Sequence, residues 1–177
     1  YNAALSGISM EGDRFFYPNP LQSIGQHERS PWFGCACCPS NVARFIPSVP
    51  GFGYANKDDD LYVNLFISGN ATIETTDNTV KLVQQTNYPW DGRIDITVEP
   101  QKSESFAVRV RIPGWAQNEV VPSDLYNFAV ASKEKPSLTV NGRDVPIKLE
   151  DGYACINRKW AKGDKIQLDL PMPIRRI

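Results

Sequence analysis

Short segments in which apolar and polar residues alternate fill most of the chain after residue 54, and they restrict it to a β fold. Residues 93–98, Arg-Ile-Asp-Ile-Thr-Val, alternate strictly, which places one face of a strand in a core and the other in water. Many short strands separated by turn signals predict β-sandwich or jelly-roll units. The other expected strands lie in 61–67, 80–85, 106–112, 138–140, 153–156 and 166–170, and the tight-turn dipeptides are Asn141-Gly142 and Asp151-Gly152.

The first 53 residues have a different pattern. Pro39 is expected in the first turn of a short helix over 40–45, because a helix does not need its missing N–H there. Pro47 and Pro50 are expected to end that helix.

Domain boundaries follow from these patterns. Residues 99–105 are expected to link two β units, 54–101 and 102–177, and residues 117–136 are expected to form a surface insertion. The prediction is a mostly β chain with two β-sandwich, jelly-roll-like units after a non-β segment, 1–53.

Composition excludes some partners. The chain has 19 basic and 20 acidic residues, so nothing suggests attraction to nucleic acid or to an anionic membrane. The longest apolar runs, such as 65–67, are far shorter than a membrane span. The cellular compartment stays open, between a cytoplasmic and a periplasmic location of bacterial type.

Three of the four cysteines, Cys35, Cys37 and Cys38, lie within four positions. The Cα atoms of neighbouring residues stand about 3.8 Å apart, so an adjacent pair reaches disulfide geometry only with strain. Cys37 and Cys38 are therefore expected to be two ligands of one metal, for which zinc is the best candidate, or a ligand beside a reactive thiolate. Three loosely packed free thiols remain the alternative.

Two other residues carry side chains that can bind a metal or react. His27 is the only histidine; it could be a further ligand, but a surface position in a polar loop is the simpler interpretation. Cys155 lies in an apolar strand-like run and is expected to be a small buried side chain.

The cysteine segment, residues 32–44, resembles the cysteine-proline motif of glycoside hydrolase family 127, the β-L-arabinofuranosidases. The resemblance implies that this chain is a C-terminal fragment, in which a short segment from the end of a catalytic (α/α)6 barrel precedes the β-sandwiches. Further stretches that resemble the family are 1–7, 13–21, 87–92, 111–115, 151–153, 160–164 and 170–173.

The same resemblance implies roles for three residues. Cys37 would be the nucleophile of a retaining hydrolase, Cys37 and Cys38 would bind zinc, and Tyr17 would line the sugar site. A Glu-x-Cys segment and an acid/base glutamate earlier in the barrel would complete the site. Zinc suits this chemistry because a coordinated thiol is deprotonated and its basicity is reduced.

Departures from the family pattern limit what the chain alone should do. Residues 1–34 contain no Glu-x-Cys, neither Glu11 nor Glu28 has a matching context, and Cys35 has no role in the pattern. The fragment is therefore expected to be inactive and to bind zinc weakly at best. Its expected partners are a carbohydrate substrate and the missing N-terminal part of the barrel.

A non-catalytic function is the alternative hypothesis to the hydrolase. The chain could be a β-sandwich module for carbohydrate binding or structural support, with the cysteine segment as an inert tail. Trp90 and Trp115 could form a sugar-stacking platform, but aromatic residues beside Pro-Gly turns are more often core plugs at sandwich ends.

Overall fold

The computed structural model describes residues 7–18, 20 and 22–177. The chain divides into two compact units, residues 1–50 and 51–177, and each is described by itself. Within the described residues, no helix is both long and apolar enough to span a bilayer.

The described part of the first unit consists of irregular chain followed by one helix, α2 (Cys37–Ser48). Phe15 organises the irregular part, since it forms β-bridges with Ile8 and Ser30 and an edge-to-face contact with the Trp32 ring. Pro39 is the third residue of the helix, which confirms its place in the first turn.

The prediction that Pro47 ends the helix was wrong. Pro47 lies inside α2, which runs to Ser48 and continues as the 3-10 turn η1 (Val49–Phe52). A proline removes one helical hydrogen bond and crowds the preceding turn, but only one residue of α2 follows it. The helix therefore loses little by including Pro47 in its last turn.

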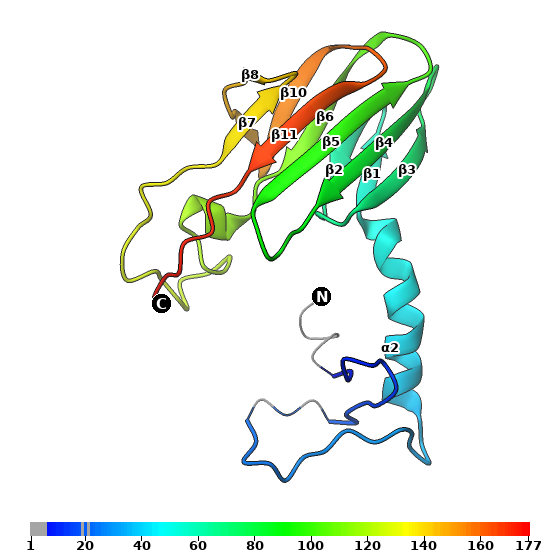
Figure 1. The fold of residues 1–177 in the computed structure, drawn as a ribbon, viewed down its shortest axis with the longest axis vertical. Coiled ribbons are helices and arrows are strands. Elements are labelled where there is room, and N and C mark those ends of the chain that lie inside the picture. The colour runs from blue at the N-terminus through cyan, green and yellow to red at the C-terminus, as the bar shows by residue number, and fades with distance from the viewer. Residues whose placement is uncertain (1–6, 19, 21) are drawn as a thin grey trace. The chain divides into compact units, whose positions relative to one another are not determined.

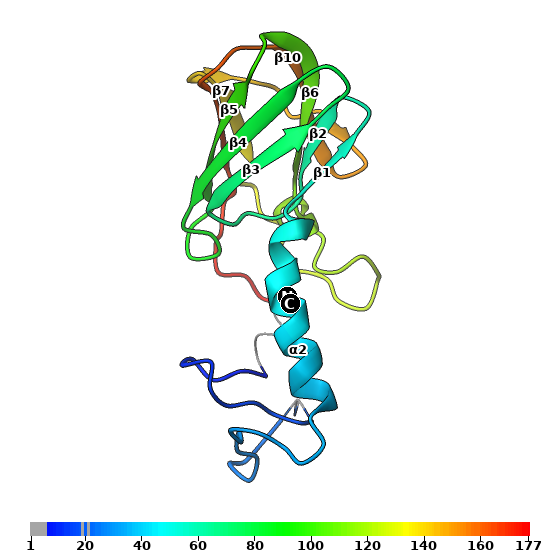
Figure 2. The same ribbon diagram turned by 90° about the vertical axis from the view of Figure 1, so that its right-hand side faces the viewer.

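The second unit is a sandwich of two sheets, which Figures 1 and 2 show from two directions at right angles. Five strands form one sheet in the order β1-β2-β6-β10-β9, and six form the other in the order β3-β4-β5-β11-β7-β8. The mostly β prediction is confirmed. The strands are β1 (Tyr54–Lys57), β2 (Asp60–Val63), β3 (Gly69–Glu74), β4 (Thr79–Thr86), β5 (Arg93–Pro100), β6 (Glu104–Arg111), β7 (Ser137–Val140), β8 (Arg143–Asp144), β9 (Leu149–Glu150), β10 (Tyr153–Trp160) and β11 (Asp164–Asp169).

One hydrophobic core lies between the sheets. In β5 the buried residues are Ile94, Ile96 and Val98, as the alternating pattern predicts, and then Pro100 at the strand end. Trp160 at the end of β10 is fully buried, and its indole N–H donates a hydrogen bond to the Phe106 carbonyl oxygen at 3.0 Å. The large Trp160 side chain is therefore buried in the core with its only polar atom hydrogen-bonded.

The structure differs from the predicted pair of β units. Strands pair across the expected boundary at residue 101: β2 lies parallel to β6, and β11 is antiparallel to β5. Residues 54–101 and 102–177 also contribute to the same core cluster. Each half alone would leave its apolar faces uncovered, so the two halves form one sandwich.

The supposed linker, residues 99–105, is mostly strand, because β5 runs to Pro100 and β6 begins at Glu104. Only residues 101–103 form the crossover between these strands. Asn78, which is buried, holds it in place. Its side-chain amide donates to the Lys102 carbonyl oxygen at 2.8 Å, and its side-chain oxygen accepts from the Lys102 N–H at 3.2 Å.

The expected strand over 61–67 is shorter than the apolar run. It ends at Val63, and the Asn64 N–H donates to the Gly53 carbonyl oxygen in register with the pairing of β1 and β2. The buried Gln84 side chain then donates to the carbonyl oxygens of Leu65 and Ile67, at 3.1 and 2.6 Å. A side chain thus replaces a neighbouring strand as partner of this segment.

Both predicted tight turns are present. Asn141 and Gly142 have φ values of 51° and 74°, and Asp151 and Gly152 have 51° and 84°. Positive φ at both central residues is the signature of a type I′ hairpin turn.

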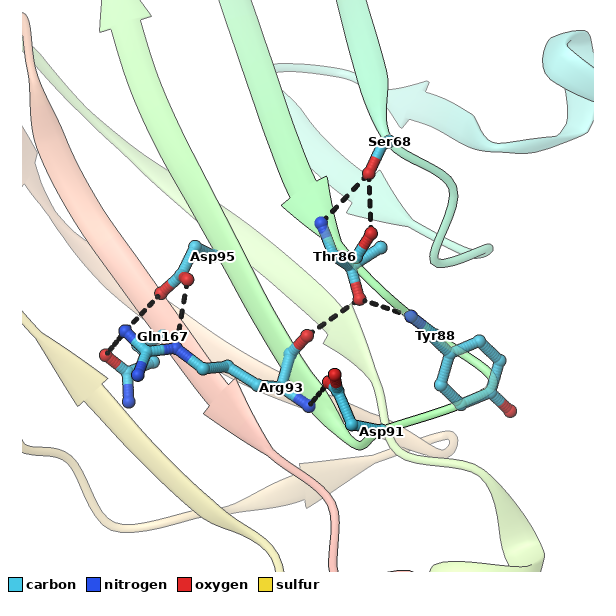
Figure 3. A network of polar contacts seen from close by, with 7 residues as sticks. All are labelled: Ser68, Thr86, Tyr88, Asp91, Arg93, Asp95 and Gln167. Atoms are coloured by element: carbon cyan, nitrogen blue, oxygen red, sulfur yellow. Dashed lines mark hydrogen bonds and ion pairs between the residues drawn. The ribbon is translucent and has the colours of Figure 1, made fainter.

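The turn between β4 and β5 is fixed by a network of polar contacts, drawn in Figure 3. The Thr86 hydroxyl donates to the Arg93 carbonyl oxygen at 2.7 Å and accepts from the Tyr88 N–H at 3.0 Å. The Asp91 carboxylate accepts from the Arg93 N–H at 3.1 Å. The Tyr88 ring points away from this network (Figure 3).

Residues 117–136 form the expected surface insertion, which follows the 3-10 turn η2 (Gly114–Gln117). The C-terminal tail, red in Figure 1, runs beside it. The Arg175 guanidinium lies 3.3 Å from the centre of the Phe128 ring and donates to the Asn118 side-chain oxygen at 2.7 Å. Arg175, and the Arg176 carbonyl oxygen that accepts from the Ala129 N–H at 3.0 Å, therefore connect the tail to the insertion.

Gly92 provides a test of this fold. Its carbonyl oxygen accepts from the Leu170 N–H at 2.9 Å, and a Cβ at this position would overlap the Leu170 carbonyl oxygen. Gly92→Ala should lower the free energy of unfolding by about 2 kcal/mol or more, since backbone must move. Urea denaturation of the 177-residue chain measures this.

Gly69→Ala is the matched control, because a Cβ there meets nothing within 4 Å. It should change stability by about 0.5 kcal/mol or less. Equal effects of the two substitutions would contradict the close approach at Gly92.

Candidate functional site

Cys37 is the first residue of α2, and local hydrogen bonds fix its backbone. The Ser40 hydroxyl and the Asn41 side-chain amide both donate to the Cys37 carbonyl oxygen, at 3.1 and 2.9 Å. Arg44 donates in turn to the Asn41 side-chain oxygen at 3.0 Å. The first helical turn therefore holds the exposed Cys37 thiol in a defined position.

Tyr17 reaches this thiol from the irregular segment. Its hydroxyl oxygen lies 2.9 Å from the Cys37 sulfur, although the two residues are 20 positions apart. The Phe33 ring packs edge-to-face against the Tyr17 ring with 5.4 Å between centres. Tyr17 itself stays 40% exposed. The structure thus brings together two residues that the sequence singled out separately.

The pKa values of the Cys37 thiol and the Tyr17 phenol shift in opposite directions. The bond to Tyr17 is the main cause that lowers the pKa of the Cys37 thiol, and the Cys38 and Cys35 thiols lower it further. The same bond raises the pKa of Tyr17. The thiol therefore ionises before the phenol, and once Cys37 is a thiolate the Tyr17 O–H is the donor of this hydrogen bond.

Cys38 lies beside Cys37 with 3.8 Å between the sulfur atoms. The interaction with Cys37 and burial both raise the pKa of the Cys38 thiol. Two thiolates that bind one tetrahedral zinc at about 2.3 Å stand about 3.8 Å apart. The pair therefore fits two positions of a zinc site.

The described residues supply no more than this pair. Among residues 7–18, 20 and 22–177, no group of three or more His, Cys, Asp or Glu side chains could hold a metal. Cys35 and His27 are both exposed. A zinc ion at Cys37 and Cys38 would need its remaining ligands from other residues.

The aromatic and cysteine candidates in the sandwich have separate places. Cys155 is half-buried in β10, and burial raises the pKa of its thiol. Trp115 packs partly buried against the core cluster, as a core plug should. Trp90 does not, because it is 84% exposed on the β4–β5 turn.

Comparison with known proteins agrees with both units of the chain. Residues 1–51 match the family model "Beta-L-arabinofuranosidase, GH127 catalytic domain", and residues 60–172 match "Beta-L-arabinofuranosidase, GH127 middle domain". The chain belongs to glycoside hydrolase family 127. The resemblance inferred from the cysteine segment is confirmed.

Individual GH127 relatives are similar along nearly the whole chain. A non-reducing end β-L-arabinofuranosidase of Bifidobacterium longum subsp. longum is 30% identical, over 100% of this chain and 26% of the relative. A solved GH127 β-arabinofuranosidase is 48% identical with a TM-score of 0.88, over 96% of this chain and 27% of that one. A GH127 β-L-arabinofuranosidase from Geobacillus stearothermophilus T6 is 36% identical with a TM-score of 0.81, over 97% and 26%.

This GH127 chain thus spans about a quarter of the length of these relatives. The matched catalytic segment contains Tyr17, Cys37 and Cys38, whereas the matched middle domain is the sandwich.

The contact between Tyr17 and Cys37 is testable in the 177-residue chain. Tyr17→Phe removes the O–H that stabilises the thiolate, so the pKa of Cys37 should rise. Because only the thiolate reacts, the pH midpoint of Cys37 alkylation by iodoacetamide should move to higher pH. Peptide mass spectrometry separates Cys37 from its neighbours.

Tyr126→Phe, at an exposed tyrosine of the insertion, should leave the midpoint unchanged. A midpoint that stays the same in Tyr17→Phe would show that the hydroxyl does not set the reactivity of Cys37.

Proposed function

We propose that this chain forms part of a retaining glycoside hydrolase that cleaves β-L-arabinofuranosides or related plant sugars, with Cys37 as nucleophile. The observation that carries this proposal is the Tyr17 hydroxyl at 2.9 Å from the Cys37 sulfur, with the Cys38 sulfur 3.8 Å from the same atom. The names of the relatives, β-L-arabinofuranosidases, support the substrate class.

A retaining hydrolase needs a nucleophile that attacks the anomeric carbon and later leaves it. In the first step the Cys37 sulfur forms a C–S bond while the glycosidic C–O bond breaks, and an acid protonates the departing oxygen. In the second step water attacks the same carbon, a base takes its proton and the C–S bond breaks, which restores the thiolate. The acid/base carboxyl is expected from an upstream glutamate of the catalytic domain.

Tyr17 has two parts to play in this scheme. Its O–H donates to the Cys37 thiolate, which keeps the sulfur ionised before attack and stabilises it again when it leaves. Its half-exposed ring also offers an apolar face to the carbon–hydrogen side of a sugar. Tyr17 is therefore both a positioning residue for the nucleophile and a substrate contact.

Cys37 and Cys38 are the residues of this chain that would hold zinc. Bound zinc would keep both thiols deprotonated and lower their basicity. The raised pKa of Cys38 supports the need for a cation, since the ionised Cys37 opposes a second negative charge beside it. The alternative, a non-catalytic sandwich module, requires neither thiol to ionise.

The nucleophile can be tested in a protein that joins this chain to the upstream catalytic segments that its relatives contain. Cys37→Ser and Cys37→Ala should each lower kcat on an aryl β-L-arabinofuranoside by about 10³-fold or more, because the covalent step is lost. Cys155→Ser, in a strand of the sandwich, should retain activity. Full activity of Cys37→Ser would favour the non-catalytic alternative.

Zinc gives a separate prediction. The complete protein should contain one zinc per chain by elemental analysis, and Cys38→Ser should release it. The 177-residue chain alone, with two described ligands, should bind zinc weakly and show no hydrolysis. Hydrolysis by this chain at the rate of a complete enzyme would contradict the expected half-site.

A further inference from the structure

A cavity of about 650 Å³ opens at one end of the sandwich, and the thiol site does not use it. It lies between the segment after β2, the β4–β5 turn, the end of β6, η2 and the start of β10. All these elements belong to residues 51–177, so the sandwich forms the cavity by itself. This volume falls in the range of small-molecule sites, about 300–1,000 Å³.

Three partly buried aromatic residues line the cavity, and each also contacts protein groups beside the cavity. Tyr88 packs edge-to-face against Phe66 with 5.5 Å between ring centres, while the polar network of Figure 3 fixes its backbone. The Tyr153 hydroxyl donates to the Asn64 side-chain oxygen at 2.9 Å. Trp115 packs against the core cluster. These rings are therefore oriented before any ligand arrives.

Charged side chains on the same cavity have no partner within the described part of the chain. The Arg111 guanidinium, at the end of β6, makes no ion pair or side-chain hydrogen bond there. Arg109, two residues earlier in the strand, instead pairs with Asp60 at 3.0 Å and with Glu150. The carboxylates of Glu119 and Asp151 also line the cavity and are equally unpaired in the described residues.

We propose that this cavity is a second, non-catalytic binding site for a neutral saccharide. One cation against two carboxylates disfavours an anionic ligand. Oriented aromatic faces suit the apolar side of a sugar ring, whereas the unpaired guanidinium and carboxylates suit its hydroxyls. The expectation that the sugar contains arabinose rests on the proposed function, but the site itself does not.

The experiment uses the 177-residue chain, with methyl β-L-arabinofuranoside as probe and nuclear magnetic resonance titration as readout. We expect saturable shifts of the amides around Tyr88, Arg111 and Tyr153. Arg111→Gln should weaken binding about tenfold, the loss of one hydrogen bond to a charged group. Glu119→Gln should weaken it in the same direction, and both residues are exposed, so the fold should survive.

Three controls separate this site from others. Arg143→Gln, at an exposed arginine of β8, should bind as the unchanged chain does. Trp90→Ala, on the same turn as Tyr88 but outside the cavity lining, should also bind normally. Cys37→Ser should retain binding, so that failure of the hydrolase proposal and failure of this one are distinguishable.

Two outcomes would overturn the proposal. One is the absence of saturable shifts with the furanoside. The other is binding that Arg111→Gln and Glu119→Gln leave intact while Cys37→Ser or Trp90→Ala removes it, because the sugar would then lie at the thiols or on the exposed indole.

Discussion

The two sheets of the sandwich can bury their apolar faces only against each other, and the rest of residues 51–177 depends on this constraint. Because strands of both halves of the sequence alternate between the sheets, neither half has a core of its own. The β5–β6 crossover, the buried Asn78 and the close approach of Gly92 to Leu170 all serve this arrangement. The cavity at the sandwich end exists because loops of both sheets meet there.

Strands with a strong alternating pattern were predictable, and strands that expose most of their side chains were not. β5 and β6 contain the expected strands, 93–98 and most of 106–112, since the buried positions in those stretches are Ile, Val, Phe and Ala. Each strand also takes two residues, 99–100 and 104–105, that were expected in a linker. β1 and β3 were missed as separate strands, because Tyr54–Lys57 and Gly69–Glu74 bury almost nothing and are polar. The single sandwich was also unpredictable, since the pairing of β2 with β6 joins residues nearly 50 positions apart and no local pattern records it.

At the thiol site, too, features set by neighbouring residues were predictable, and a contact between residues distant in the sequence was not. Pro39 indicated the helix start, and the adjacent cysteines indicated a metal pair or a reactive thiolate. The roles of Cys37 as nucleophile and of Tyr17 as sugar contact were implied only by the family resemblance. That the Tyr17 O–H meets the Cys37 sulfur could not be predicted, because the contact depends on how the irregular segment folds back over 20 residues.

The two units also differ in what stabilises them. The sandwich has a continuous core, whereas among the described residues of α2 only Pro39 is buried. A 12-residue helix is marginal in water without packing. The model that matches residues 1–51 is a catalytic domain, and the relatives are about four times as long. Packing by the rest of such a domain is therefore the natural source of stability for α2. The hydrogen bond from Tyr17 acts on the Cys37 thiol locally, whereas the nucleophilic role proposed for this thiol also requires a substrate pocket, which the rest of the catalytic domain would supply.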